Sequence, residues 1–324
     1  MRAMVAEKFE DYGALRLSEL EPPKLEDGEV LVRMISAGVT PLDYTILSGH
    51  FPFATAPLVL GNEGSGIVES DGVPEFPAGT NVVFCGPYGV SRNGTYSEKI
   101  AVRREHLLRV PDGVDPASAA GLPVAYLTAY LALQKAGFSQ GKSVLAPAIG
   151  GSIGNAAIQL ARAQGASQAI STSTSTAKVQ QAKDAGFTEV IDLSMESLAA
   201  GVKRLTGGKG VDIVIDGIGG EVLGQGIASL APAGTAITLG YSGDKKSRID
   251  VTDLIWKGAS LLSFSLFGYP AEDWQTAWKA MEPLFASGKL TPIVARTFRL
   301  EDAAEALRFQ IEKRPFGRVL LQMN

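Results

Sequence analysis

The chain has 324 residues, with 30 basic and 34 acidic side chains and a formal net charge of −4 at pH 7. Hydrophobic residues make up 45% and charged residues 20%, which supports packed cores in about two domains and excludes disorder and collagen-like repeats. The acidic balance and the lack of a run of Lys and Arg argue against a nucleic-acid partner.

The single cysteine, Cys85, excludes an internal disulfide and a cysteine-rich zinc site, and it fits a reduced compartment. The first residues lack the apolar core of a signal peptide. The longest apolar stretch, residues 121–133, is shorter than the about 20 residues that a membrane span needs. We therefore expect a soluble, cytoplasmic protein with no membrane partner.

The first third of the sequence predicts a β-rich unit with few helices. Short apolar and β-branched runs alternate with turn residues, among them Asp27–Gly28 and Asp71–Gly72. The predicted strands are Met4–Ala6, Glu29–Ala37, Gly66–Glu69 and Thr80–Phe84. Cys85 follows the last of these strands, so we expect its thiol to be buried in the core rather than to act as a nucleophile.

Strand and helix patterns alternate after a helix pair predicted over residues 115–137. The predicted strands are Lys142–Ala148, Ala169–Thr172, Glu189–Asp192, Val211–Asp216 and Ala236–Leu239, and the predicted helices are Ser152–Gln164, Thr176–Ala185 and Leu198–Thr206. This alternation predicts βαβ units around a parallel sheet. A final helix at Asp302–Lys313 and a strand at Gly317–Gln322 fit either unit.

A glycine-rich turn, Ala148–Gly154, lies between a predicted strand and a predicted helix. Small residues there allow a pyrophosphate to come close, and the N–H groups of the following helix can hold its charge. A tight turn without a ligand is the alternative. The same residues match the G-x-S-x-G elbow of hydrolases around Ser152. That class places its histidine after the serine, whereas His50 and His106 both precede it, so we reject a hydrolase.

The end of the second strand of this series indicates which cofactor binds. NAD-binding folds usually carry an acidic residue there, about 20 residues after the glycines. This chain instead has six hydroxyl residues, Ser171–Thr176, followed by Lys178. Hydroxyls and a lysine suit a 2′-phosphate, which favours NADPH over NADH. The alternative is a polar loop with a solvated lysine.

Short motifs along the chain carry a further resemblance. They are Pro41–Asp43, Ser48–Gly49, Gly61–Gly66, Leu127–Tyr130, Ala148–Gly154 with Ile158–Ala161, Thr206–Gly208 before Val211–Asp212, and Phe316–Leu320. In this order and spacing the sequence resembles the medium-chain dehydrogenase/reductase superfamily, and specifically its zinc-free, quinone-oxidoreductase-like branch. The resemblance implies an α/β fold in which a GroES-like, β-rich catalytic domain (residues 1–120 and 287–324) accompanies a Rossmann domain with a doubly wound parallel sheet (residues 121–286). The active site is expected in the cleft.

The resemblance also bears on metal binding. Zinc-dependent members have Cys where this chain has Thr40 and His where it has Asn62, and only Glu63 is kept. We therefore expect no metal. Without a Lewis acid, the expected chemistry is hydride transfer from NADPH to a quinone or an α,β-unsaturated carbonyl.

By the same matching, the candidate catalytic residues are Asp43, Tyr44, Phe51 and Asn62. Tyr44 lies one position before the tyrosine of many relatives, where this chain has Thr45, so the proton donor is either Tyr44 or solvent. Phe51 matches a position where relatives often have Tyr, and it either stacks on a flat acceptor or packs in the core.

The expected cofactor contacts come from the cleft, from the strand ends and from the C-terminus. They are Thr40, Thr128, Gly151, Ser152, Ile153, Ser173, Lys178, Gly217, Leu239, Gly240, Tyr241, Ser242, Phe264, Ser265, Leu266, Arg314 and Arg318. A solvated surface charge is the alternative for Arg314 and Arg318. Two departures from the pattern of the relatives are Ser152, which replaces a common glycine, and Pro147, which ends the first Rossmann strand.

Two alternative functions remain. One is a 2-enoyl thioester reductase acting on a CoA or carrier-protein substrate, since Gly61–Gly64 resembles that group. Those enzymes, however, carry a Tyr just after the position of Gly49, and the sequence gives no position for their CoA-binding basic residues. The other alternative is an NADPH-binding structural protein with little turnover. A homodimer is expected through the apolar, strand-like segment Ala259–Phe267, unless the chain itself covers that edge.

Overall fold

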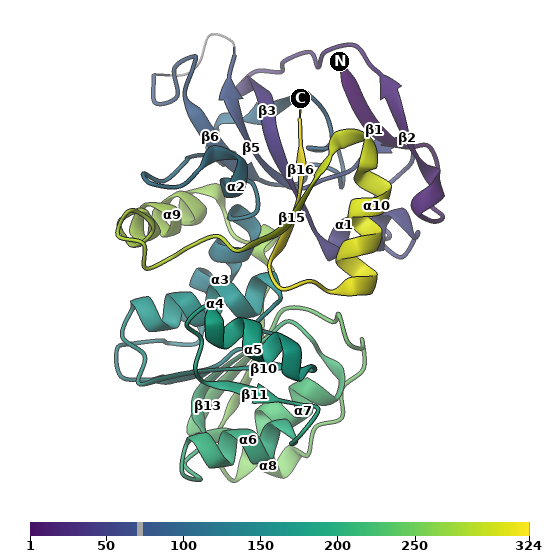
Figure 1. The fold of residues 1–324 in the computed structure, drawn as a ribbon. Helices are drawn as coiled ribbons and strands as arrows, with labels where there is room; N and C mark the ends of the chain where they lie inside the picture. Colours follow the sequence, from purple (N-terminus) through teal and green to yellow (C-terminus); the bar gives the residue numbers. More distant parts are fainter. Residues whose placement is uncertain (70–73, 324) are drawn as a thin grey trace. The chain divides into compact units, whose positions relative to one another are not determined.

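Residues 1–69 and 74–323 are described by the computed structural model, and they fall into two units (Figure 1). The first unit comprises Met1–Val124 and Tyr269–Asn324, and the second comprises Ala125–Gly268. The predicted turn at Asp71–Gly72 lies outside the described residues. None of the helices in the described ranges is long and apolar enough to cross a membrane.

The first unit contains two sheets. Its larger sheet has seven strands in the order β15-β16-β3-β5-β6-β8, with β7 pairing with β3, and its smaller sheet has the order β2-β1-β4. The strands are β1 (Arg2–Ala6), β2 (Leu15–Glu19), β3 (Glu29–Val39), β4 (Leu58–Val59), β5 (Glu63–Val68), β6 (Asn81–Cys85), β7 (Lys99–Arg103), β8 (Leu107–Arg109), β15 (Val294–Arg299) and β16 (Arg318–Gln322). Most neighbours are antiparallel, and only β15 and β16 are parallel. The predicted β-rich unit is therefore confirmed.

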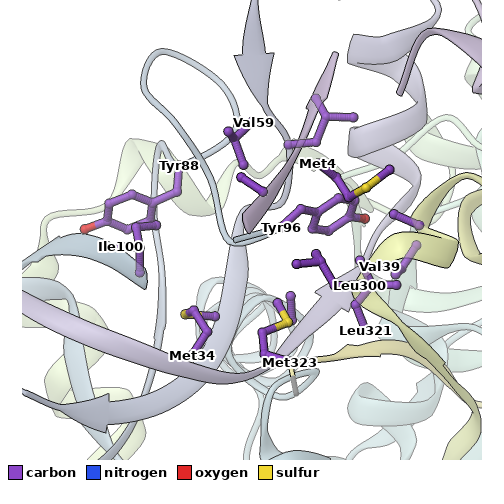
Figure 2. Close-up of a cluster of buried hydrophobic side chains, with 14 of the residues drawn as sticks. Met4, Met34, Val39, Val59, Tyr88, Tyr96, Ile100, Leu300, Leu321 and Met323 are labelled. Carbon is purple, nitrogen blue, oxygen red and sulfur yellow. The ribbon is translucent and has the colours of Figure 1, made fainter. Parts of the chain in front are cut away.

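The core of this unit brings the two sheets together. Figure 2 shows Met4 from β1, Met34 and Val39 from β3, and Leu321 from β16 among the buried side chains. Cys85, at the end of β6, is only 1% exposed, as predicted. Burial raises the pKa of its thiol well above the usual value, and the nearby charge of Glu63 adds to the rise. A thiol held neutral in this way is a packing group.

Helices are few and short in the β-rich part of the chain. They are α1 (Pro41–Leu47), α2 (Pro116–Ala119) and the 3-10 turns η1 (Tyr12–Ala14) and η2 (Arg104–His106). The segment predicted to be helical over 302–313 is helical throughout. It divides into the 3-10 turn η4 (Leu300–Asp302), α10 (Ala303–Arg308) and a π-helical turn, η5 (Phe309–Lys313).

Helix α9 (Ala271–Ala286) belongs to the first unit, which places the second boundary earlier than the predicted residue 286. Its Trp274 ring lies 5.4 Å from the His106 ring. Its Trp278 indole N–H donates to the carbonyl of Arg109 over 2.9 Å. Both tryptophans are buried, so α9 contributes its apolar face to the β-rich unit.

The second unit is a doubly wound parallel sheet in the order β11-β10-β9-β12-β13-β14. Its strands are β9 (Ser143–Leu145), β10 (Gln168–Ser173), β11 (Val190–Asp192), β12 (Val211–Asp216), β13 (Leu230–Thr238) and β14 (Ser260–Ser263). All its neighbouring strands are parallel, which confirms the predicted fold class. β9 stops three residues before the predicted end, since Pro147 lacks an N–H and Ala148 has φ of 65°.

The helices of the second unit follow the strands in alternation. They are α4 (Ser152–Ala163), α5 (Thr176–Asp184), α6 (Leu198–Leu205), α7 (Gly220–Ala228) and α8 (Val251–Ile255), while the 3-10 turn η3 (Leu266–Gly268) closes the unit and α3 (Pro123–Lys135) begins just before it. The predicted helices 152–164, 176–185 and 198–206 each agree with an observed helix to within one residue. The predicted alternation of strands and helices is therefore confirmed for these three helices.

Candidate active site and cofactor-binding turn

A buried polar cluster lies at the N-terminus of α1. Thr40 is the N-cap, Pro41 opens the helix, and Asp43 completes a capping box. One carboxylate oxygen of Asp43, Oδ2, accepts hydrogen bonds from the Thr40 backbone N–H (2.7 Å), the Thr40 hydroxyl (2.8 Å) and the Tyr96 hydroxyl (3.1 Å). Asp43 is fully buried, so its carboxyl is shielded from water at the start of the helix.

The environment of Asp43 favours its protonated form more than water does. Burial raises the pKa of this carboxyl to about 6, while hydrogen bonds from Thr40 and Tyr96 lower it and the charge of Glu63 adds to the rise. The second oxygen, Oδ1, has no hydrogen-bond partner among the described residues. A carboxyl of this kind can hold or release a proton near neutral pH.

Tyr96 is a functional candidate that the sequence analysis missed. Its ring lies against Gly61, whose φ is 96° and where an added Cβ would come within 2.5 Å of Tyr96 Cδ1. Figure 2 shows Tyr96 among the apolar side chains of the core. Tyr96 stands 53 residues after Asp43, and no local pattern signals a pairing at that separation.

A buried ion pair joins Glu63 on β5 to Arg318 on β16. The Glu63 side chain is fully buried and that of Arg318 is 10% exposed. The second oxygen of Glu63 accepts from the backbone N–H of Val124 over 2.8 Å. Burial raises the pKa of Glu63, while the charge of Arg318 and the Val124 N–H lower it. The carboxylate is therefore engaged on both oxygens.

Two glycines make room for this ion pair. A Cβ at Gly38 would lie 2.6 Å from Glu63 Oε1, and one at Gly121 would lie 2.7 Å from Arg318 Nε. The solvent-exposed alternative for Arg318 is therefore wrong, because the side chain is buried between strands and glycine backbone. Its Nε has no partner among the described residues, and a cofactor contact through that atom stays a prediction.

The residues at the zinc-ligand positions do not suit zinc. Thr40 and Asn62 offer a hydroxyl and an amide where catalytic zinc takes Cys and His, and Glu63 is engaged by Arg318. No group of three or more His, Cys, Asp or Glu side chains that could hold a metal occurs in residues 1–69 and 74–323. Asn62 is 2% exposed, and its Oδ1 has no partner within those ranges. This oxygen can accept an N–H or O–H from a ligand.

Two predicted catalytic residues lie in aromatic contacts of their own. The Tyr44 ring stacks on the Tyr12 ring, with 5.0 Å between the ring centres. The Arg308 guanidinium lies 5.0 Å from the centre of the Tyr12 ring. Phe51 contacts Phe53 edge to face at 5.6 Å, and Phe53 is 76% exposed. The structure thus joins Asp43 to Thr40 and Tyr96, while Tyr44 stacks on Tyr12 of η1.

The predicted pyrophosphate turn lies between β9 and α4. Gly151 is the N-cap of α4 and makes no side-chain cap hydrogen bond. A Cβ at Gly154 would lie 2.3 Å from the carbonyl oxygen of Pro147, so the first turn of α4 packs directly on the loop. Ser152 and Ile153 follow on α4, and both are half-buried. A helix start without a side-chain cap and a close glycine contact fit a pyrophosphate.

The hydroxyl residues after Ala169 have different roles. The Ser171 hydroxyl donates to Ala146 O, the Thr172 hydroxyl accepts from the Ala148 N–H, and the Thr176 hydroxyl donates to Asp192. Ser173, the last residue of β10, is 7% exposed and pairs in register with Asp192 on β11. Hydrogen bonds from the hydroxyls of Ser194 and Thr176 lower the pKa of Asp192. Lys178 is half-buried on α5.

Glycines also bring the ends of β12 and β13 together. A Cβ at Gly240 would lie 2.5 Å from the carbonyl oxygen of Gly217. The Ser242 hydroxyl donates to that same carbonyl over 3.2 Å. Asp216 is buried and accepts the N–H groups of Ile218 and Gly219, which closes the turn into α7. Burial raises the pKa of this carboxyl, and these two N–H groups lower it.

The other predicted cofactor contacts differ in exposure. Thr128, Phe264 and Leu266 are buried, Leu239 is half-buried, and Tyr241, Ser265 and Arg314 are exposed. Arg314 has φ of 45°, a left-handed backbone at the end of the π-helical turn. Each of these contacts stays a prediction.

Comparison with known proteins decides the family. Residues 26–112 match the alcohol dehydrogenase GroES-like domain, and residues 152–283 match the zinc-binding dehydrogenase family. A quinone oxidoreductase of Pseudomonas aeruginosa is 30% identical, over 97% of this chain and 98% of its own length. The chain belongs to the medium-chain dehydrogenase/reductase family.

Further relatives refine this assignment. A synaptic vesicle membrane protein VAT-1 homolog of Danio rerio is 28% identical over 99% of this chain and 69% of its own. A mycobacterial protein solved in complex with NADPH has a TM-score of 0.88 and 29% identity, and the match covers 99% of this chain and 100% of that one. This member of the family is an oxidoreductase of the zinc-free, quinone-oxidoreductase-like branch, with a pyridine nucleotide as its cofactor.

The ion pair between Glu63 and Arg318 yields a test of stability. Arg318→Met leaves a buried carboxylate without its cation, so we expect the free energy of unfolding to fall by about 3–5 kcal/mol. Adding Glu63→Gln removes the stranded charge and should recover a large part of that loss. Urea unfolding of the two single variants and the double variant measures both effects. A loss below about 1 kcal/mol for Arg318→Met would show that the pair does not hold the unit together.

Proposed function

We propose that this chain is an NADPH-dependent reductase that transfers a hydride to a quinone or an α,β-unsaturated carbonyl without a metal. The observation that carries the proposal is the buried carboxyl of Asp43, joined to Thr40 at a position where zinc relatives hold their metal. When bound, the dihydronicotinamide supplies the hydride. The protein must then orient both reactants and manage one proton.

The start of α4 and the end of β10 would hold the cofactor. The N–H groups after Gly151 would bind the pyrophosphate, and Gly217 and Gly240 would leave room along the carboxyl edge of the sheet. Ser173 and Lys178 would contact the 2′-phosphate. The carboxylate of Asp192 stands beside Ser173, but it accepts two hydroxyl hydrogen bonds from Thr176 and Ser194.

Asp43 and Thr40 would supply the proton. Reduction of a quinone or an enone takes up a hydride and a proton, so the acceptor gains two electrons while the dihydronicotinamide loses them. The Thr40 hydroxyl, 2.8 Å from Asp43 Oδ2, would pass its proton to the acceptor and take a replacement from the Asp43 carboxyl. This pair supports a route that does not need Tyr44. The open Oδ1 of Asn62 would accept a ligand N–H or O–H.

The proton route predicts a pH dependence. Because Asp43 must be protonated, kcat for quinone reduction should fall as the pH rises through about 6, the raised pKa of this group. Thr40→Val should lower kcat by about 100-fold, the smaller end of a general-acid contribution. Thr40→Ser keeps the hydroxyl and the helix cap, so its kcat should stay within a few-fold.

Tyr96→Phe serves as the matched variant for this route. Its hydroxyl lowers the pKa of Asp43, so its removal should move the fall in kcat to higher pH. Steady-state rates with NADPH and a small quinone, measured between pH 5 and 9, would show both effects. Wild-type kcat in Thr40→Val, with an unchanged pH profile, would rule out this route.

The cofactor preference yields a second test. Ser173→Asp places a carboxylate where the 2′-phosphate of NADPH is expected, so KM for NADPH should rise about tenfold or more through repulsion between like charges. The same carboxylate can accept the ribose 2′-hydroxyl of NADH, so KM for NADH should not rise. Ser173→Ala controls for loss of the hydroxyl. Equal changes for the two cofactors would contradict the assignment of this strand end.

A homodimer remains part of the proposal, while the cytoplasmic location stays a prediction. β14 is the last strand of its sheet, and Leu262 on it is 37% exposed. Ile255 and Trp256 nearby are 70% and 83% exposed. An apolar edge with unpaired backbone groups suits pairing with a second copy about a twofold axis.

Sedimentation at micromolar concentration tests the dimer. The expected mass is twice the 34.0 kDa of one chain. Leu262→Lys places a charge on the edge and should yield monomers, whereas Met195→Lys, at another exposed apolar side chain, should leave the mass unchanged. A wild-type protein that sediments as a monomer would contradict the dimer.

A further inference from the structure

Ala148 adopts a left-handed backbone conformation at the start of the glycine-rich turn. Its φ is 65°, a value that residues with a Cβ rarely adopt, because the side chain crowds the backbone. Gly150 and Gly151 follow closely, yet the left-handed position itself is occupied by alanine. A strained backbone persists only where its surroundings hold it, so the contacts of Ala148 identify what fixes the turn.

Strand β10 holds Ala148 and Ile149 through Thr172. The Ala148 N–H donates to the Thr172 hydroxyl over 3.0 Å, and the Ile149 N–H donates to the Thr172 carbonyl over 2.9 Å. Thr172 is 2% exposed, so water competes little for these hydrogen bonds. One residue thus binds two successive N–H groups of the turn, and only the first of these bonds depends on its side chain.

Helix α4 holds the same two residues through their carbonyls. The Ala148 carbonyl accepts the N–H of Gly151, the N-cap residue, over 2.8 Å. The Ile149 carbonyl accepts a hydrogen bond from the Asn155 side-chain amide over 3.2 Å. Gln159, one turn further along α4, donates to the side-chain oxygen of Asn155 over 2.7 Å. Every backbone N–H and carbonyl of residues 148–149 is therefore engaged within the second unit.

The left-handed conformation sets the path of the chain into α4. Rotation about φ of one residue moves all the residues that follow, and only three residues separate Ala148 from Ser152, the first residue of the helix. A Cβ at Gly154 would lie 2.5 Å from the Ala148 carbonyl oxygen, so the first turn of α4 packs against this peptide group. A relaxed Ala148 would therefore displace the N–H groups after Gly151, to which the pyrophosphate is proposed to bind.

We propose that Thr172 is a positioning residue for the cofactor: its hydroxyl holds Ala148 in the left-handed conformation and thereby keeps the pyrophosphate turn ready to bind. This inference rests on the proposed function, in which the start of α4 binds the pyrophosphate. Thr172 acts on the fraction of molecules that hold the binding conformation, and the apparent affinity falls with that fraction. Its role differs from that of Ser173, which is proposed to contact the 2′-phosphate.

Thr172→Val removes the hydroxyl and nearly keeps the shape of the side chain. The Kd for NADPH, measured by the fluorescence of the bound dihydronicotinamide, should rise about fivefold, which corresponds to about 1 kcal/mol, the net value of one hydrogen bond. KM for NADPH should rise with it, whereas kcat at saturating NADPH should stay within about twofold. Thr172→Ser keeps the hydroxyl, so its Kd should stay within about twofold of the wild type. An unchanged Kd in Thr172→Val would overturn the inference.

Ala148→Gly tests whether the hydroxyl acts through the strained backbone. Glycine adopts a φ of 65° without steric cost, so the turn then depends less on the hydroxyl. Ala148→Gly alone should bind NADPH within about twofold of the wild type. Thr172→Val/Ala148→Gly should recover most of the affinity that Thr172→Val loses. Effects that simply add in the double variant would show that Thr172 does not act through Ala148, and the inference would fail.

Thr206→Val is a matched control at the opposite edge of the sheet. The Thr206 hydroxyl accepts the N–H of Gly210, which also has positive φ, over 3.1 Å. Gly210 precedes β12, whereas Ala148 follows β9, and these two strands are parallel neighbours. Urea unfolding should show a loss of stability for both threonine variants, but Thr206→Val should leave the Kd for NADPH unchanged. Equal rises in Kd would indicate a general loosening of the unit and would contradict the inference.

The fragment 2′-AMP separates the turn from the neighbouring strand end, because it carries the adenosine and 2′-phosphate of NADPH but no pyrophosphate. Its affinity, measured by displacement of NADPH, should be the same in wild type and in Thr172→Val. A fivefold loss for 2′-AMP as well would place the effect at Ser173 and overturn the inference. Thr172-dependent binding of NADPH without turnover of any acceptor would overturn the proposed reductase function and still support the positioning role. A wild-type protein that binds neither NADPH nor NADH would overturn both.

Discussion

The ion pair between Glu63 and Arg318 holds together segments that lie 255 residues apart in the chain. The two side chains come from the C-terminal strand β16 and from β5, and strand β3 lies between these two strands in the sheet. Both charges are buried, so each depends on the other and on the Val124 N–H to offset lost hydration. Gly38 and Gly121 are needed because any Cβ at either position would meet this pair. The C-terminal segment is thereby part of the β-rich unit.

The ion pair between Glu63 and Arg318 also affects the nearby carboxyl of Asp43. Glu63 is neutralised by Arg318, whereas Oδ1 of the nearby Asp43 has no hydrogen-bond partner in the described ranges. Its pKa of about 6 follows from burial opposed by three hydrogen bonds, two from Thr40 and one from Tyr96. A zinc relative uses these positions for a Lewis acid, whereas this chain has a carboxyl and a hydroxyl within hydrogen-bond distance. The proposed proton route uses this buried carboxyl and hydroxyl, at a position where zinc-dependent members of the family hold their metal.

At the carboxyl edge of the second unit, polar side chains have distinct tasks. Six hydroxyl residues, 171–176, form the end of β10 and the residues after it. Among them, Ser171, Thr172 and Thr176 make hydrogen bonds that support the fold. Ser173 lies at the strand end, in register with Asp192, and its hydroxyl donates to the carbonyl of Ser175 over 3.5 Å. Across the sheet, Asp244 anchors a loop that presents three cations.

The sequence by itself determined the elements whose signal is local. The alternation of strands and helices, the glycine turn before α4, the burial of Cys85 and the absence of zinc ligands at Thr40 and Asn62 follow from residue type and spacing. Tertiary structure decided the pairings that cross the chain: Tyr96 with Asp43 over 53 residues, Arg318 with Glu63, and α9 with the β-rich unit through Trp274 and Trp278. The ring of Tyr44, whose role as a proton donor stays a prediction, stacks on Tyr12. Periodicity reports which face of an element is apolar, but which residues meet across a core depends on sheet register and on the packing of distant segments.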